Sequence, residues 1–505
     1  MSQTRYLKSM ITPTLVEPTT SDATIVGVAS GVWSVQDQLE AKRGGAWPDA
    51  SVPDPDTLIE NNFATTLWTG NETDDTAITT GLDFSSDTGL VWIKNRGGGD
   101  SHNLYDTVRG ATKYLKSDST AAEATLSAGL KSFTSTGFTV GTDDLVNKDG
   151  EQFVAWSFKK APKFFDVVKY TGNGTAGRTI AHSLGTTVGM LIIKELGGAN
   201  DWDVLHRSTE VLRLNSTAGP LSGYAPSRFG DGSSLVRPTS SVFTVGASGE
   251  VNGDGQTYIA YLFAHETGDD SMIQCGSYTG NANAVGPVID LGWEPQFLLI
   301  KNADRADDWV MLDTMRGIGA STHGPDVLFA NTDDSRNAPA STISQATRID
   351  LTAVGFDVKQ TNSRINGNNQ KHIYIAIRRP NMTTITDATK LFATATGNDA
   401  VPEYTAGFVV DFAFYKELTS TDAWEVHSRL QGTRASLNFD STNAEGDDGS
   451  SNGARFDLDN VSYQGKKDEG SGFQAWMWAR AKGYFDAVAY TGTGSARTIA
   501  HGLGA

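Results

Sequence analysis

The sequence predicts an all-β protein, in which tandem β-sandwich or jelly-roll (lectin-like) repeat domains follow a short N-terminal arm and helix. Two observations lead to this prediction. One stretch recurs along the chain, and the intervals between its copies hold short alternating apolar runs separated by Gly, Asn and Asp turns. The 505 residues include 54 glycines and are 38% hydrophobic, which suits several packed cores joined by tight turns.

The recurring stretch is clearest from Phe165, where it reads FDVVKYTGNGTAGRTIAHSLG, and it returns from Phe485 as FDAVAYTGTGSARTIAHGLGA. Two copies this similar indicate internal duplication. Weaker copies keep the TG turn and the strand that follows it. Their spacing of about a hundred residues predicts one domain per repeat rather than a rung of a solenoid. The residues before the successive TG turns are Trp68, Tyr170, Tyr278, Ala395 and Tyr490.

The copies divide the chain into an N-terminal segment, four complete repeats and the start of a fifth. We expect the repeats to be separate beads on a string, each with seven to nine short strands and no long helix. The predicted boundaries are 1–60 for the arm, helix and linker, 61–162, 163–268, 269–382 and 383–482 for repeats one to four, and 483–505 for the start of the fifth.

The N-terminal segment differs from the repeats. Pro13 and Pro18 interrupt a polar stretch, which predicts an arm. The run GVWSVQDQLEAKRGGAWP then predicts one short helix that begins after Ser34 and ends at Gly44. Packing on the first repeat remains open, and so does docking on another protein as an anchoring or trimerising element, because so short a helix needs a partner surface. The candidate docking residues are Trp33, Val35, Leu39 and Trp47.

Composition argues against several classes of function. The net charge of −18 disfavours nucleic-acid binding, since counterion release needs clustered Lys and Arg. No apolar run reaches the roughly 18 residues of a membrane span, and the N-terminus lacks the apolar core of a signal peptide. The single cysteine, Cys275, excludes an intramolecular disulfide, and we expect it to be a buried small hydrophobic residue.

A polar pair recurs in the repeats, with a lysine at the end of a strand and an acid or histidine one turn later. Because it recurs in every repeat, we interpret it as an internal strut of the fold in preference to a binding pair. Trp202, Trp309 and Trp424 precede the second member, and core or rim packing is favoured over a sugar platform. The pairs are Lys94 with Asp106, Lys194 with His206, Lys301 with Asp313, and Lys416 with His427.

No residue pattern predicts a catalytic, cofactor or metal site. The HExxH motif, the nucleophile elbow and the GxxxxGK phosphate loop are all absent from the sequence. His182 and His501 share one sequence context but lack further ligands at zinc spacing. The acidic loop from Asp143 to Glu151 predicts a solvated hairpin, with weak calcium binding as the alternative. We therefore expect neither an enzyme nor a cofactor.

Several phrases resemble a repeat of about a hundred residues in virion and tail-fibre proteins of marine tailed phages, above all phages of cyanobacteria. They are GLVWIKNR from Gly89, LYDTVRGATKYLKSDST from Leu104, and YTGNG followed by RTIAHSLG from Tyr170. GVWSVQDQLEA also resembles an N-terminal motif of phage fibre proteins. The third repeat departs from the pattern with AIRR in place of an aromatic residue, and the fourth lacks RTIAH.

The resemblance implies a structural virion protein, expected to be a tail fibre or appendage subunit of an extracellular phage particle. It would attach through its N-terminus to other tail proteins, form a homotrimer, and project its beads toward the host surface and its glycans, without binding nucleic acid or entering a membrane. The alternatives are a capsid or neck decoration protein, a tail-associated glycan depolymerase that uses two carboxylates, or a bacterial adhesin. We also expect the chain to continue beyond residue 505, or to swap its end into a neighbour, since so short a part of a β-domain cannot bury its core.

Overall fold

The computed structural model describes residues 58–268, 270–318, 326–335, 348–380, 382, 387–432, 435–447, 455–465, 472–490, 492 and 494–503. The predicted N-terminal helix, with Trp33, Val35, Leu39 and Trp47, lies outside these residues. All four repeats belong to a single compact unit that runs from Ile59 to Ala505.

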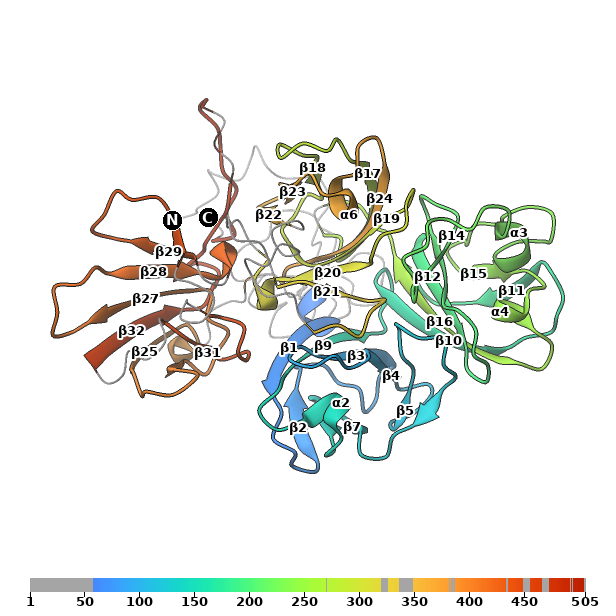
Figure 1. The fold of residues 1–505 in the computed structure, drawn as a ribbon, viewed down its shortest axis with the longest axis horizontal. Coiled ribbons are helices and arrows are strands. Elements are labelled where there is room, and N and C mark those ends of the chain that lie inside the picture. Colours follow the sequence, from blue (N-terminus) through green and yellow to red (C-terminus); the bar gives the residue numbers. More distant parts are fainter. Residues whose placement is uncertain are drawn as a thin grey trace, which may run out of the picture. The chain divides into compact units, whose positions relative to one another are not determined.

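Antiparallel β-strands make up nearly all the regular structure, as predicted (Figure 1). Among the described residues, the first repeat has nine strands, the second seven, and the third and fourth eight each. The helices within the described ranges are single turns of three or four residues. In the part of the chain that the structure describes, no helix has the length and apolar character needed to span a membrane.

The elements of the first two repeats follow one another in a similar order. The first comprises η2 (Ile59–Asn61), β1 (Phe63–Thr69), β2 (Thr76–Thr79), β3 (Gly89–Asn95), β4 (Asn103–Asp106), β5 (Lys113–Tyr114), β6 (Ala124–Thr125), β7 (Leu130–Thr134), β8 (Gly137–Val140), α2 (Asp144–Asn147) and β9 (Gln152–Lys159). The second comprises β10 (Phe165–Thr171), β11 (Arg178–Ala181), β12 (Val188–Glu195), β13 (Asp203–His206), β14 (Val211–Arg213), α3 (Ala225–Arg228), β15 (Val242–Val245), α4 (Gly249–Asn252) and β16 (Thr257–Ala264).

The third and fourth repeats keep this order. The third comprises β17 (Ile273–Thr279), β18 (Val288–Asp290), β19 (Pro295–Asn302), β20 (Val310–Asp313), η3 (Thr314–Arg316), β21 (Leu328–Phe329), β22 (Ile349–Thr352), β23 (Gly355–Val358), α6 (Ser363–Asn366) and β24 (Lys371–Arg378). The fourth comprises η4 (Ala388–Lys390), β25 (Phe392–Thr396), β26 (Tyr404–Thr405), β27 (Phe412–Glu417), β28 (Glu425–Ser428), η5 (Arg429–Gln431), β29 (Ala435–Asn438), β30 (Gly446–Asp447), β31 (Ser462–Tyr463) and β32 (Phe473–Trp478).

Each repeat builds its main sheet by placing its last strand between its first strand and its third strand. The strand orders are β1-β9-β3-β4, β10-β16-β12-β13-β14, β17-β24-β19-β20-β21 and β25-β32-β27-β28-β29-β30. A smaller sheet completes the sandwich, formed by β2-β8-β7, β11-β15, β18-β23-β22 and β26-β31 in turn. The four repeats therefore share one topology.

The TG turn of each of the first three repeats is held by a buried asparagine at the end of a helical turn. In the first repeat, Asn147 accepts a hydrogen bond from the main-chain N–H of Asn71 (3.0 Å) and donates to the carbonyl of Gly141 (2.9 Å). Trp68 donates its indole N–H to the carbonyl of Val146 (3.2 Å). The expected solvated hairpin is therefore wrong, because this acidic stretch forms the helical turn α2, which Asp143 caps. The corresponding asparagines of the next two repeats are Asn252 and Asn366.

The main sheets of the first three repeats are buried on both faces. In β3, Val91 and Ile93 face the smaller sheet of the first repeat, whereas Leu90 and Trp92 face away from it. Every residue of β3, β12 and β19 is nevertheless buried. Strands of this kind carry continuous apolar runs, because water reaches neither side of the sheet. The second face must therefore be covered by other parts of the chain.

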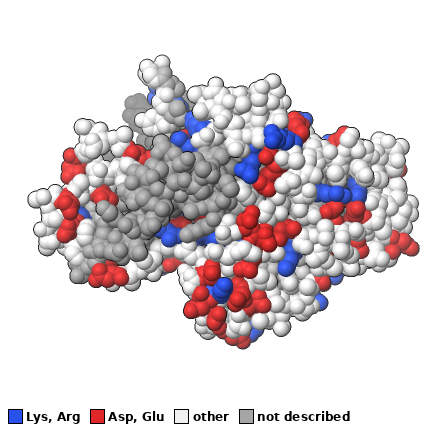
Figure 2. All heavy atoms as spheres, in the orientation of Figure 1, with Lys and Arg blue, Asp and Glu red and all other residues white. Residues whose placement is uncertain are grey.

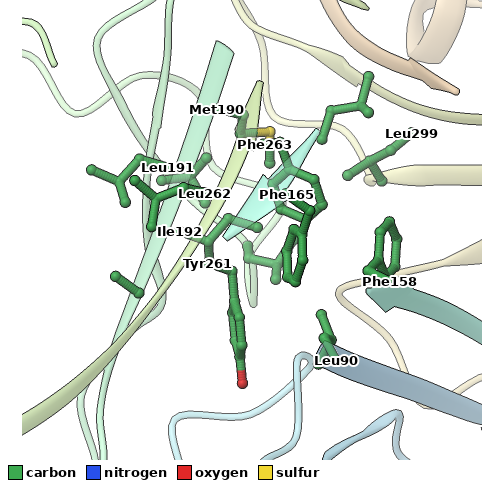
Figure 3. Packing of buried hydrophobic residues seen from close by; sticks show 14 of the residues in the cluster. Leu90, Phe158, Phe165, Met190, Leu191, Ile192, Tyr261, Leu262, Phe263 and Leu299 are labelled. Carbon is green, nitrogen blue, oxygen red and sulfur yellow. The ribbon is translucent and has the colours of Figure 1, made fainter. Parts of the chain in front are cut away.

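The second faces of the three sheets cover one another. One cluster of buried apolar side chains extends from Ile59 to Ile377 and draws on all three repeats. Figure 3 shows Phe158 of the first repeat near Phe165 and Phe263 of the second, with Leu299 of the third close by. The ring of Phe158 lies 5.5 Å from that of Phe263 and 6.4 Å from that of Phe297. The first three repeats are thus not the separate beads that the repeat pattern suggests, because their cores are joined.

Replacement of Phe158 by Ala should destabilise all three repeats together. The change removes an aromatic ring from the shared core, which typically costs about 3–5 kcal/mol. Denaturant unfolding measures this loss, and hydrogen exchange shows where it is felt. Amides of the second and third repeats should lose protection along with those of the first. Loss of amide protection confined to the first repeat would contradict a shared core. The matched control is Tyr224→Ala, which alters an exposed aromatic side chain.

Candidate functional site: the junctions between repeats

The last residue of β4, β13 and β20 stands at the junction with another repeat. The three residues are equivalent, because they lie opposite the same position of β3, β12 and β19. In the first repeat this residue is Asp106, which is fully buried. It accepts a hydrogen bond from the hydroxyl of Tyr261 of the second repeat (2.7 Å) and binds the guanidinium of Arg109. Burial raises the pKa of Tyr261, so its hydroxyl remains a donor.

The third repeat uses the same arrangement toward the first. Asp313 accepts a hydrogen bond from the indole N–H of Trp156 (2.9 Å) and from Nε of Arg316 (2.6 Å). The guanidinium of Arg316 also lies over the ring of Trp156, 5.1 Å from its centre. Trp156 stands at the strand position that Tyr261 has in the second repeat. Each carboxylate thus holds an aromatic donor of another repeat beside its own arginine.

The second repeat has a histidine at this position. His206 is fully buried, and its Nε2 lies 3.4 Å from the carbonyl oxygen of Tyr374 in the third repeat. Its Nδ1 accepts a hydrogen bond from the main-chain N–H of Ser208 (3.1 Å), so Nε2 carries the proton and donates. Burial lowers the pKa of His206 to about 3, which keeps the ring neutral.

These contacts close a ring of three repeats. The second repeat contacts the first, and the first contacts the third, through equivalent residue pairs. The second contacts the third through His206 and the carbonyl of Tyr374, one residue before the position that Trp156 and Tyr261 occupy in their repeats.

Two tryptophans add hydrogen bonds between repeats of the ring. Trp202 donates to the carbonyl of Lys116 in the first repeat (2.8 Å), and Trp309 donates to that of Arg213 in the second (2.9 Å). Every repeat of this group therefore touches both of the others.

The recurrent lysines bind loops rather than the acids with which we paired them. Lys94 lies four positions along β3 from Leu90, the residue opposite Asp106, so Lys94 and Asp106 are roughly 13 Å apart along the strand direction. Nζ of Lys94 donates instead to the carbonyls of Asp100 (2.6 Å) and, in the third repeat, Asp333 (3.0 Å). The predicted pairs are therefore wrong as pairs, since the two members belong to different networks. Lys194, Lys301 and Lys416 likewise bind main-chain carbonyls.

The fourth repeat departs from the predicted alignment by one residue. Ser428, not His427, lies opposite Phe412 and so occupies the position of Asp106. His427 is the residue before it in β28 and lies opposite Ala413, so its side chain points to the other face of the sheet. There its Nδ1 meets the hydroxyl of Tyr463 in the repeat's own core. His427 is thus not the counterpart of Asp106.

Arg96 joins the fourth repeat to the ring. Its guanidinium is fully buried and lies 3.0 Å from a carboxylate oxygen of Asp326 in the third repeat. It also lies 2.6 Å from the carboxylate of Asp457 in the fourth repeat. A second ionic contact links Arg379 to Asp411 (2.6 Å) beside a cavity of about 440 Å³ between the first, third and fourth repeats. Buried charges of three repeats thus neutralise one another at these boundaries.

The chemistry of the junctions is that of adhesion between repeats. Their carboxylates are bound by arginine, tyrosine or tryptophan, and their lysines by main-chain carbonyls. Across the described ranges, no three His, Cys, Asp or Glu side chains are grouped so as to hold a metal ion. Cys275 is buried between the second and third repeats, where its thiol lies 3.3 Å from the carbonyl of Ala264. Burial raises the pKa of this thiol.

Sequence reasoning overlooked several junction residues that carried a recognisable signal. Arg109 and Arg316 stand in the matching phrases DTVRG and DTMRG, three residues after the junction carboxylate. The asparagines that hold the TG turns follow an apolar residue in DLVN, GEVN and SRIN. Arg96 belongs to no recurring sequence motif, because the other repeats have Leu or Ala at its position.

Fold and junctions together define a tandem-repeat β-sandwich protein whose first three repeats form one structural unit. A family model described as a domain of unknown function (DUF7483) matches residues 60–379, well over half of the chain. The chain therefore belongs to this family. The matched range contains all three repeats of the ring and ends before the fourth. A search of curated proteins found no match.

Replacement of Arg96 by Ala should cost about 3–5 kcal/mol, because it leaves the buried carboxylates of Asp326 and Asp457 without their shared arginine. Denaturant unfolding gives the change in free energy. Lys131→Ala is the control, since Lys131 pairs with Asp74 at the surface and such pairs contribute only about 0–1 kcal/mol. Equal effects of the two substitutions would contradict the role of Arg96.

Acid should weaken the junction between the second and third repeats. The pKa of His206 is about 3 in the folded protein against an ordinary value of 6.5, so the unfolded chain binds a proton that the folded protein does not. The contribution of neutral His206 to the free energy of unfolding is therefore fully present above pH 6.5 and is lost as the pH falls toward 3. At pH 4.5 this loss is about 2–3 kcal/mol. His102, whose pKa is also lowered by burial, acts in the same direction.

His206→Gln tests this assignment, because glutamine can donate to the carbonyl of Tyr374 but does not titrate. The loss of stability between pH 7 and pH 4.5, measured by denaturant unfolding, should be about 2 kcal/mol smaller in the variant than in the unmodified protein. An identical loss in both proteins would show that His206 does not contribute to the acid sensitivity.

Proposed function

We propose that this chain is a structural, non-enzymatic protein of a tailed-phage virion and serves as a subunit of a tail fibre or a related appendage. Its N-terminal segment attaches it to other tail proteins. Its repeats face outward and contact the host surface, including surface glycans, on an extracellular particle. The protein neither binds nucleic acid nor inserts into a membrane.

The closed ring of three repeats is the observation that supports this proposal best. Its buried polar groups are engaged in holding one repeat against another, as a rigid support requires. The resemblance of the repeats to those of marine phage virion proteins supplies the setting. On the face shown in Figure 2, basic side chains form small groups among acidic ones, and acidic side chains gather over the first repeat. Such a surface offers little to a nucleic-acid backbone.

Immunogold labelling of purified phage particles tests the proposal, with an antibody raised against the second repeat, residues 163–268. Label at the tail or its appendages is the expected result, and antibody pre-adsorbed with the purified chain is the control. Label over the head would identify a decoration protein instead. A lack of label on intact particles, with the antibody still recognising the protein in infected cells, would overturn the virion assignment.

A further inference from the structure

The cavity between the first, third and fourth repeats has a lining that suits a small organic molecule. Its volume of about 440 Å³ is within the range of ligand sites in proteins. Its apolar lining includes Phe63, Met315, Leu391, Phe408 and Val409. The charged residues of the lining are the basic Arg379, Lys390, Arg429 and Arg480 and the acidic Glu60 and Asp411. The cavity therefore combines apolar surface with an excess of basic side chains.

Arg429 is the basic residue of this lining whose hydrogen bonds are incomplete. Its side chain is only 2% exposed. Its Nε donates to the carbonyl of Val410 (3.0 Å), and its Nη1 donates to that of Phe456 (3.2 Å). Its Nη2 has no hydrogen-bond partner among the residues that the structure describes. A buried N–H of a charged group is costly without an acceptor, so an acceptor supplied by a ligand would stabilise Arg429.

The carboxylates at this boundary are bound to other groups. Asp411 lies 3.9 Å from Nε of Arg429, which is beyond hydrogen-bond length. Its two oxygens accept instead from Nη2 of Arg379 (2.6 Å) and from the main-chain N–H of Arg480 (2.9 Å). Glu294 binds Arg379 and lies 3.7 Å from Arg480. The positive charge of Arg429 is therefore only weakly compensated within the chain.

The junction arginines of the ring show the contrast. Arg109 and Arg316 are also buried, and each binds the carboxylate three residues before it. The fourth repeat has Ser428 at the position of that carboxylate. Burial lowers the pKa of Arg429 to about 10, which still leaves its guanidinium charged at neutral pH. Arg429 thus carries a buried positive charge that an anion would stabilise.

Thr65 adds a second donor to the lining. Its side chain is buried, and its hydroxyl has no hydrogen-bond partner among the described residues. A carboxylate has two oxygens and can accept hydrogen bonds from a guanidinium and from a hydroxyl. A second negative charge on the ligand would be repelled by Glu60 and Asp411, which line the same cavity. The polar lining therefore favours a ligand with a single carboxylate.

The apolar lining determines the rest of the ligand. Leu391 and Phe408 are 6% and 8% exposed, so they present apolar surface inside the cavity. Apolar ligand surface that packs there contributes about 25 cal/mol for each Å² removed from water. A sugar ring would instead lose hydrogen bonds to water that these side chains cannot replace. The body of the ligand should therefore be apolar.

We propose that this cavity binds a small organic monocarboxylate with an apolar body, whose carboxylate accepts hydrogen bonds from Arg429 and Thr65 and whose body packs on Leu391 and Phe408. The cavity is lined both by residues within the family match, 60–379, and by residues of the fourth repeat. A bound ligand would therefore also stabilise the contact between the ring and the fourth repeat. This site goes beyond the proposed function, because ligand binding here requires neither a virion nor a host.

Isothermal titration calorimetry of the purified full-length chain with benzoate tests the site, because benzoate carries one carboxylate on an apolar ring. Saturable binding of one benzoate per chain is the expected result. Benzamide is the matched neutral probe, since its amide has nearly the same shape without the charge, and it should bind roughly tenfold more weakly. Glucuronate carries its carboxylate on a hydroxylated ring and should also bind roughly tenfold more weakly.

Two variants locate the binding. Arg429→Gln removes the guanidinium and should weaken benzoate binding roughly tenfold. Circular dichroism and thermal unfolding verify that this variant is folded, since Arg429 is buried. Val409→Asp adds a negative charge to the lining at a side chain that is 38% exposed, where the fold should tolerate it. It should weaken benzoate binding about threefold and leave benzamide binding unchanged.

Val285→Asp is the matched control, because it makes the same change at a residue of the third repeat that is 78% exposed and lies outside the cavity lining. It should leave the binding of both probes unchanged.

A titration without saturable benzoate binding would overturn the inference and leave water as the occupant of the cavity. Equal affinities for benzoate and benzamide would contradict the role of charge, and an equal affinity for glucuronate would contradict the role of the apolar lining. Benzoate binding that neither Arg429→Gln nor Val409→Asp weakens, or that Val285→Asp weakens as much, would place the ligand elsewhere and overturn the site.

Discussion

A β-sheet that is apolar on both faces must be covered on both faces, and this requirement governs the architecture of the protein. In each of the first three repeats, one face of the main sheet is covered by the smaller sheet of the same repeat. The other face is covered by the main sheets of the two other repeats. A single repeat could therefore form its own sandwich and still expose a row of large apolar side chains. The stable unit is the group of three, because only together do the repeats remove this second face from water.

The polar residues at the junctions give this apolar contact its specificity. Apolar surfaces can slide past one another with little change in energy, whereas a buried carboxylate or indole N–H must meet its partner to offset the loss of water. Asp106 and Asp313 each satisfy this requirement through an arginine of their own repeat and an aromatic donor of another. His206 satisfies it as a neutral ring. The junction residues of the three repeats thus stand at equivalent positions but differ in chemistry, and each is satisfied by a partner in another repeat.

The sequence was sufficient to predict an all-β fold of short antiparallel strands, because turn residues and apolar alternation are local signals. It also predicted that Cys275 is buried. The joined core was missed for a physical reason. An apolar run such as LVWI in β3 shows that both faces of a strand are dry, but not which part of the chain covers the second face. Spacing alone suggested a pair formed by Lys94 and Asp106, whereas strand register sets the two apart. His427 was misaligned by one residue, because the pairing of β28 with β27 places Ser428, four residues after Trp424, at the position of His206.

Closure of the ring also bears on how such a chain can change during evolution. Repeats in an open solenoid are added or lost one at a time, since each contacts only its neighbours in sequence. Here the first repeat contacts the third directly, so deletion of any one of the three would uncover two apolar faces at once. Similar neighbouring copies favour unequal recombination. Such an event would then yield a viable protein only when it adds or removes a complete group of three repeats. Gene length in this family should accordingly vary in steps of several hundred residues rather than of one repeat.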